Sequence, residues 1–150
     1  MQNISLAQVR RDGVGTVFDD PSWIRRAMLI ERIADRYAAG ILSPGDRRVA
    51  EDLFRLAIYD GEILVRQVVA ESLKRTAWLP RDIVLAMARD THEVARPLLL
   101  CSPALSDDDL IAIARNGSWL HRRAIADRAG LSGRVVRALG ENAEMDRLAS

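Results

Sequence analysis

Three acidic or amide residues are each followed, six positions later, by an arginine. The pairs are Asp60 with Arg66, Asp90 with Arg96, and Asn116 with Arg122. A guanidinium is a planar fork of N–H donors that matches a carboxylate, so one interpretation is a structural ladder of partly buried ion pairs between successive helical units. The other interpretation is that the three arginines line a concave face and bind an anion. We favour the structural ladder, because the acid or amide and the arginine shift together along the chain.

Metal and nucleophile chemistry has little support in the sequence. His92 and His121 are the only histidines and Cys101 is the only cysteine, and the cysteine is in helical phase with neither histidine. A zinc site uses about four such ligands. We therefore predict no metal, no cofactor and no Cys–His nucleophile, and we interpret Cys101 as a small core residue. With no catalytic residues to name, we predict that the protein is not an enzyme.

Two short motifs resemble ligand sites but are better explained by local structure. Residues 13–15 read Gly-Val-Gly, without the third glycine or the lysine of a phosphate-binding loop. Residues 107–109 are three consecutive aspartates, which lack the spacing of a calcium loop. Acids in the first turn of a helix beginning at Ser106 are favoured by the helix dipole, which explains the aspartates.

The tryptophans and the other arginines are candidate binding residues. Trp78 and Trp119 fall at predicted helix boundaries, where they either fill gaps between helices or anchor a partner, since Trp and Arg dominate binding hot spots. The candidate interaction surface consists of four residues: Arg66, Arg96, Trp119 and Arg122. The C-terminal third also has a basic bias, which could contact phosphates. Acids are interspersed there, so we interpret it as a solvated face.

An internal repeat must position these side chains. Each acid or amide is followed by an apolar residue four positions later: Leu64, Val94 and Leu120. Leu79-Pro80, Leu105-Ser106 and Leu131-Ser132 recur at intervals of 26 residues. A period of this size is typical of stacked supersecondary units. We predict a lead-in over 1–20 and a single helical-repeat domain over 21–150, with repeats at about 61–90, 91–116 and 117–142.

The predicted fold is all-α, a right-handed α-solenoid of antiparallel helix pairs with about eight helices. Asp20-Pro21 and Ser43-Pro44 are helix-start signals, an N-cap residue followed by proline. A short amphipathic helix is predicted over 5–12, and Asn142 is predicted to form the turn before a terminal half-repeat. The later helices are expected at 62–75, 80–89, 92–102, 106–115, 118–129 and 132–141. The apolar edge of that half-repeat indicates either a truncation or a surface covered by another chain, possible as a homo-oligomer contact.

The composition sets broad limits. The chain has 150 residues, 49% of them apolar and 29% charged, which is typical of a folded domain. A net charge of +1 provides no global field toward nucleic acid or anionic lipid. A single cysteine suits a reducing compartment and no apolar run suggests a membrane span, so we predict a cytoplasmic protein with no membrane partner.

Three segments carry a family resemblance: "LSPGDRRVAEDLFRLAIYDGEILVRQVVAESLK", "LPRDIVLAMARDTHEVARPLLLCSPALSDDDLIAIA" and "RRAIADRAGLSGRVVRAL". They resemble the bacterial domain-of-unknown-function family 2336, over about residues 21 to 142. The spacing of acid and arginine within paired helices is also similar to HEAT-type repeats, and the short period to the leucine-rich-repeat variant. The resemblance implies an all-helical repeat fold and no established activity, so it transfers no catalytic residues.

We therefore predict a non-enzymatic scaffold or adaptor of HEAT-like type that binds another protein. Helical arrays of this kind offer extended concave surfaces for partners. Two alternatives stay open: a nucleic-acid-binding HEAT-like protein, and a regulatory domain that senses a small molecule held between repeats.

Overall fold

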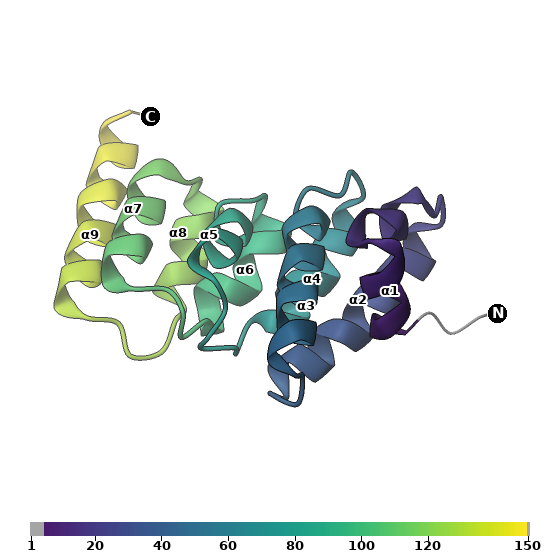
Figure 1. Cartoon of the computed structure of the whole chain (residues 1–150). Helices are drawn as coiled ribbons and strands as arrows, with labels where there is room; N and C mark the ends of the chain where they lie inside the picture. The colour runs from purple at the N-terminus through teal and green to yellow at the C-terminus, as the bar shows by residue number, and fades with distance from the viewer. Residues whose placement is uncertain (1–4, 150) are drawn as a thin grey trace. The chain divides into compact units, whose positions relative to one another are not determined.

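The computed structural model describes residues 5–149, which form nine α-helices and one 3-10 helix (Figure 1). The all-α prediction is confirmed, and no strand occurs in this range. The chain divides into two compact units, the first ending at Leu73 and the second beginning at Lys74. None of the helices in the described range is long and apolar enough to cross a membrane.

The first unit is built around a helix pair with an aromatic contact. Its elements are α1 (Leu6–Asp12), η1 (Val14–Asp19), α2 (Trp23–Ala38), α3 (Pro44–Ala57) and α4 (Ile63–Leu73). The helix α2 packs against both α3 and α4, and α1 packs against α3. Between α2 and α3 the rings of Tyr37 and Phe54 meet edge to face, with centroids 5.2 Å apart. Both side chains are fully buried, so this contact is part of the unit's core.

One of the two predicted helix-start signals is correct and the other is wrong. Ser43 caps α3 by accepting a hydrogen bond from the Asp46 N–H at 3.1 Å, with Pro44 in the first helical position. For α2 the cap is Ser22 rather than Asp20. The Asp20 carboxylate accepts hydrogen bonds from Arg25 and from the Ser22 N–H, which lower its pKa to about 2. Because that carboxylate is engaged in a turn before the helix, the helix begins later than predicted.

The second unit contains five helices, and two pairs of alternate helices in it pack together. They are α5 (Arg81–Ala88), α6 (His92–Cys101), α7 (Asp107–Asn116), α8 (Trp119–Ala126) and α9 (Gly133–Leu148). The helix α6 packs against α8, and α7 packs against α9. Helices at equivalent positions of successive predicted repeats therefore contact each other directly.

The predicted turn at Asn142 is wrong, because α9 continues through it to Leu148. The Asn142 side-chain amide donates to the Ala138 carbonyl at 2.8 Å, which is a contact along one helix. The residues that follow are Ala143, Glu144 and Met145, all good helix formers. Nothing in this stretch ends the helix, whereas Asp60 is followed by Gly61 at a real turn.

The apolar positions of the repeat are partly reassigned by the structure. The residue four positions after each acid or amide is not equivalently buried, because Leu64 is exposed, Val94 is buried and Leu120 lies in between. The position one residue later is buried in every case: Val65, Ala95 and His121. A shift of one residue turns a helical side chain by about 100°, so the core-facing stripe is rotated from the predicted one.

Candidate functional site: a groove between α7 and α9

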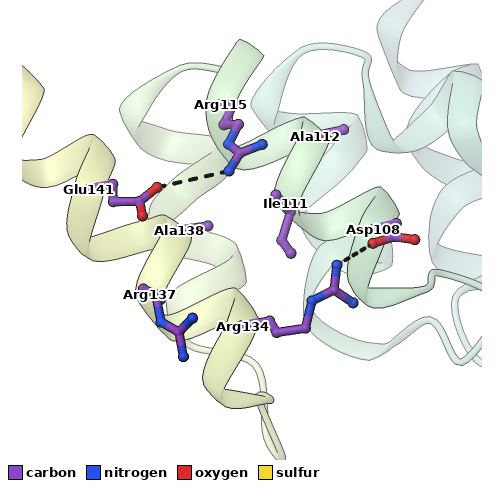
Figure 2. A pocket seen from close by; sticks show the side chains of 8 residues that line it. All are labelled: Asp108, Ile111, Ala112, Arg115, Arg134, Arg137, Ala138 and Glu141. Carbon is purple, nitrogen blue, oxygen red and sulfur yellow. Dashed lines mark hydrogen bonds and ion pairs between the residues drawn. The ribbon is translucent and has the colours of Figure 1, made fainter.

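A groove of about 330 Å³ runs along the contact between α7 and α9 (Figure 2). It is lined by eight residues: Asp108, Ile111, Ala112, Arg115, Arg134, Arg137, Ala138 and Glu141. These fall into four pairs, each made of an α7 residue and the α9 residue 26 positions later. The groove is therefore a product of the repeat, formed by one strip of two equivalent helices.

Caps fix where both helices begin, and so where the groove residues point. The Ser106 hydroxyl accepts a hydrogen bond from the Asp109 N–H at 3.2 Å, while the Asp109 carboxylate accepts from the Ser106 N–H at 3.0 Å. This reciprocal arrangement is a capping box. At the start of α9, the Ser132 hydroxyl accepts from the Val135 N–H at 3.3 Å. The first turn of each helix is thereby fixed.

A buried carboxylate ties α7 to α5. Asp109 occupies the slot that Ile83 and Val135 fill in the neighbouring repeats, and all three are buried. Both carboxylate oxygens accept from the Arg81 guanidinium, one of them at 3.0 Å. Burial opposes ionisation of Asp109, but the hydrogen bonds from Arg81 and Ser106 outweigh it and hold the pKa of Asp109 below its usual range. This pair holds α7 against α5 through a residue that does not line the groove.

Two ion pairs span the groove from α7 to α9. Arg134 Nη2 lies 2.6 Å from Asp108 Oδ1, and Arg115 Nη2 lies 3.9 Å from Glu141 Oε2 (Figure 2). All four side chains are at least 60% exposed. Exposed ion pairs are worth only about 0–1 kcal/mol, and salt screens them. A carboxylate from another molecule could therefore replace either acid at small cost.

Arg137 differs from the other two arginines of the groove. It forms no hydrogen bond or ion pair with any residue in the range 5–149, and Figure 2 shows it on α9 without a dashed contact. Its equivalent on α7 is the apolar Ile111. Between them, Ala112 and Ala138 place only methyl groups at the middle of the groove. The arrangement offers three guanidinium groups, only two of them countered by acids, around a shallow apolar centre.

The first predicted pair, Asp60 and Arg66, meets through the main chain. Arg66 Nη1 donates to the Asp60 carbonyl oxygen at 2.7 Å. The Asp60 carboxylate instead accepts two hydrogen bonds from Arg26, at 2.9 and 3.0 Å, and one from the Glu62 N–H at 2.9 Å in the turn before α4. Arg26 was missed from the sequence. It follows Asp20 by the same six residues, and it also donates to the Asp20 carbonyl at 2.7 Å.

The second predicted pair has different contacts. Arg96 Nη1 lies 4.0 Å from Asp127 Oδ2, and both side chains are nearly half exposed. The Asp90 carboxylate accepts from the Thr91 N–H at 2.6 Å, and the Asp90 carbonyl contacts His121 Nε2 at 2.7 Å. A carbonyl only accepts, so Nε2 is the donor. His121 is thus a buried structural residue that ties α8 to the turn before α6.

In the third predicted pair, Arg122 contacts Gly117, the residue after its predicted partner Asn116. Arg122 Nη1 donates to the Gly117 carbonyl at 2.8 Å, and Nη2 lies 2.5 Å from Asp146 Oδ2 on α9. The Asn116 amide donates back to the Ala112 carbonyl at 2.9 Å, within α7. Trp119, at the start of α8, is 61% exposed. A ladder of the six residues along three copies stays a prediction. So does a contact of the arginines and Trp119 with a partner.

The groove residues themselves were not identified as a site from the sequence. Arg134 and Arg137 were read as part of a solvated face, and Arg115 was not singled out. The available signal was the 26-residue alignment, in which Asp108 matches Arg134 and Arg115 matches Glu141. Equivalent positions on adjacent helices lie side by side, so opposite charges in one slot indicate a cross-helix pair.

Residues 94–150 match the sequence profile of a family described as an uncharacterised protein conserved in bacteria (DUF2336). The resemblance drawn from the sequence is thereby confirmed over that range, which contains all of α7, α8 and α9 and so the whole groove. No curated protein and no solved structure matches the chain.

Proposed function

We propose that the protein is a non-enzymatic scaffold or adaptor that binds an acidic segment of another protein in the α7–α9 groove. The observation that carries the proposal is Arg137, an exposed arginine with no partner among the described residues, beside two exposed ion pairs. Carboxylates of a partner can pair with Arg137, and can displace Glu141 from Arg115 or Asp108 from Arg134. The methyl groups of the central alanines leave room for an aliphatic stem.

The same groove argues for a protein partner over nucleic acid. Asp108 and Glu141 alternate with the arginines, and a regular row of phosphates would meet them as like charges. A polypeptide can place acids only opposite the arginines. In this proposal the protein works in the cytoplasm, and its helices form a right-handed, HEAT-like α-solenoid of antiparallel pairs. The direct packing of α6 on α8 and of α7 on α9 supports that arrangement within the second unit.

The test is a binding measurement with an acidic peptide and matched arginine variants. A fluorescently labelled peptide of alternating glutamate and alanine is titrated with wild-type protein, Arg137→Glu and Arg123→Glu at low salt. Arg123 is exposed on α8, outside the groove, so its variant has the same net charge. We expect Arg137→Glu to weaken binding about tenfold, since it replaces an attraction by a repulsion, and Arg123→Glu to have a much smaller effect.

Two results would contradict the proposal. Equal loss in the two variants would mean that net charge alone attracts the peptide. Retention of the protein on duplex DNA at moderate salt, with loss in Arg137→Glu, would assign the groove to nucleic acid instead. A partner captured from the native cytoplasm by wild type, identified by mass spectrometry, must then show the same dependence on Arg137 in a direct titration.

A further inference from the structure

A second hollow lies in the first unit and is independent of the α7–α9 groove. Its volume is about 510 Å³, within the range of small-molecule sites. The lining comes from η1, the segment before α2, α2 itself, α3 and the turn between α3 and α4. The residues are Gly15, Phe18, Asp20, Pro21, Arg26, Leu56, Tyr59, Asp60 and Gly61.

The polar part of this hollow is held rigidly. Arg26 donates to both oxygens of Asp60 and to the Asp20 carbonyl, and the Arg26 and Asp60 side chains are only 13% and 4% exposed. These three bonds use three of the five N–H groups of a guanidinium, so two donors have no acceptor among residues 5–149. The Arg26 guanidinium is therefore fixed in place and still has two N–H groups that can donate hydrogen bonds.

The charge of this polar part is balanced. Asp60 neutralises Arg26, and the Asp20 carboxylate is paired with Arg25 at 2.8 Å. An anion would gain little from a neutralised arginine and would meet two carboxylates. A neutral acceptor such as a carbonyl oxygen can use the spare N–H groups without that repulsion.

The walls are apolar and open to solvent. Phe18, Leu56 and Tyr59 surround the polar part, and Tyr59 is 78% exposed although its ring lines a hollow. Gly15 and Gly61 add no side chain, and a Cβ built on either would meet nothing within 4 Å. The hollow therefore combines apolar and aromatic lining residues with a few fixed polar groups, as small-molecule sites do.

We infer that this hollow, hereafter the Arg26 pocket, binds a small uncharged molecule that has an aromatic or branched aliphatic body and a carbonyl acceptor. The body packs between Phe18, Leu56 and Tyr59, and the carbonyl oxygen accepts from Arg26. The inference does not rest on the proposed function, because no residue of the α7–α9 groove takes part.

The probe is benzamide, with benzoate as the charged analogue of the same shape. Each is titrated to about 10 mM, a range suited to so small a ligand, into the full isotopically labelled chain followed by NMR. We expect benzamide to shift the amide signals of Gly15, Tyr59 and Gly61 and the Arg26 Nε–H signal in a saturable way. We expect benzoate to bind more weakly.

Filling the pocket supplies the decisive variant. Gly61→Leu places a side chain in the hollow, and Gly140→Leu makes the same change at a glycine on α9 where a Cβ also meets nothing. We expect benzamide affinity to fall about tenfold or more in Gly61→Leu and to be unchanged in Gly140→Leu. Tyr59→Ala removes an exposed wall without opening the core, and is expected to weaken binding about threefold.

Any of three results overturns the inference. They are an absence of saturable shifts with benzamide, shifts that persist unchanged in both Gly61→Leu and Tyr59→Ala, and tighter binding of benzoate than of benzamide. Far-UV circular dichroism checks that each variant is folded. If Gly61→Leu fails that check, Tyr59→Ala alone decides.

Discussion

Arginine–carboxylate pairs occur in two contrasting settings in this protein. In the first unit, Asp60 is buried and Arg26 largely so, and the two share a pair of hydrogen bonds and also bond to the main chain. In the α7–α9 groove, Arg115 and Arg134 are exposed and each meets a single acid. The same side-chain chemistry is therefore enclosed by the protein in one place and exposed to solvent in the other. Burial and the number of satisfied donors, rather than residue type, separate the two settings.

The largest expected effect comes from breaking the buried pair. Asp60→Ala leaves the Arg26 guanidinium uncompensated in a largely buried site and removes the acceptor for the Glu62 N–H in the turn before α4. We expect the free energy of unfolding to fall by about 3 kcal/mol. Urea unfolding followed by circular dichroism measures this. Asp35→Ala, an exposed change on α2, is the control and should stay within about 0.5 kcal/mol of wild type. A loss as small as the control's would show that the pair is not structural.

Acid should remove the stability that the buried carboxylates contribute. Burial opposes ionisation of Asp60 and Asp109, but hydrogen bonds from Arg26 and Arg81 outweigh it and lower the pKa of both. A lowered folded-state pKa adds stability above the unfolded value, about 3.9, and that stability is lost as pH falls through the folded-state pKa. We expect unfolding free energy to drop steeply below about pH 4. In Asp60→Asn the drop should be shallower, and an unchanged slope would contradict this assignment.

Removing the acids of the groove should strengthen binding. In Asp108→Asn with Glu141→Gln, Arg134 and Arg115 lose their internal competitors, so an acidic peptide meets three uncompensated arginines. We expect affinity to rise about threefold at low salt, with little change in stability. The peptide titration measures the first and urea unfolding the second. Weaker binding in this double variant would mean that the acids contact the ligand directly.

The smallest effect belongs to one exposed pair. A double-mutant cycle on Arg134→Ala and Asp108→Ala should give a coupling free energy far below the loss expected for Asp60→Ala. The hydrogen bond that Arg134 donates to Asp108 raises the pKa of Arg134, but a largely exposed pair contributes little to folding. A coupling as large as the loss expected for Asp60→Ala would remove the distinction between the two regions.

Much of the helical layout could be predicted from the sequence, because helix starts depend on local chemistry. Ser43-Pro44, and Ser106 with its acids, are caps that act within one turn. The start of α2 was misplaced because the Asp20 carboxylate accepts a hydrogen bond from Arg25. The spacing of residues in the sequence does not reveal this contact. The end of α9 was misplaced because a turn was expected at Asn142 by analogy with the earlier repeats. The residues that follow Asn142 favour a helix instead.

The sites were harder to predict, because they depend on which copies of the repeat face each other. The spacing of six correctly brought Arg66 to residue 60, but to its carbonyl rather than its carboxylate. Arg26 was overlooked since Asp20 and Asp60 are separated by 40 residues, outside the 26-residue period. Predicting the groove requires a comparison of the charges at equivalent positions of successive repeats. Exposure, which decides between structure and binding, could not be read from spacing at all.

The most direct test of the central claim is to map where an acidic peptide binds. In an NMR titration with assigned backbone signals, we predict saturable shifts at Ala112, Arg115, Arg137 and Ala138, all of which line the groove. The shifts should be absent in Arg137→Glu and present in Arg123→Glu. Shifts centred instead on Arg66, Arg96 or Trp119, with the α7–α9 signals unmoved, would contradict the assignment of the groove as the binding site.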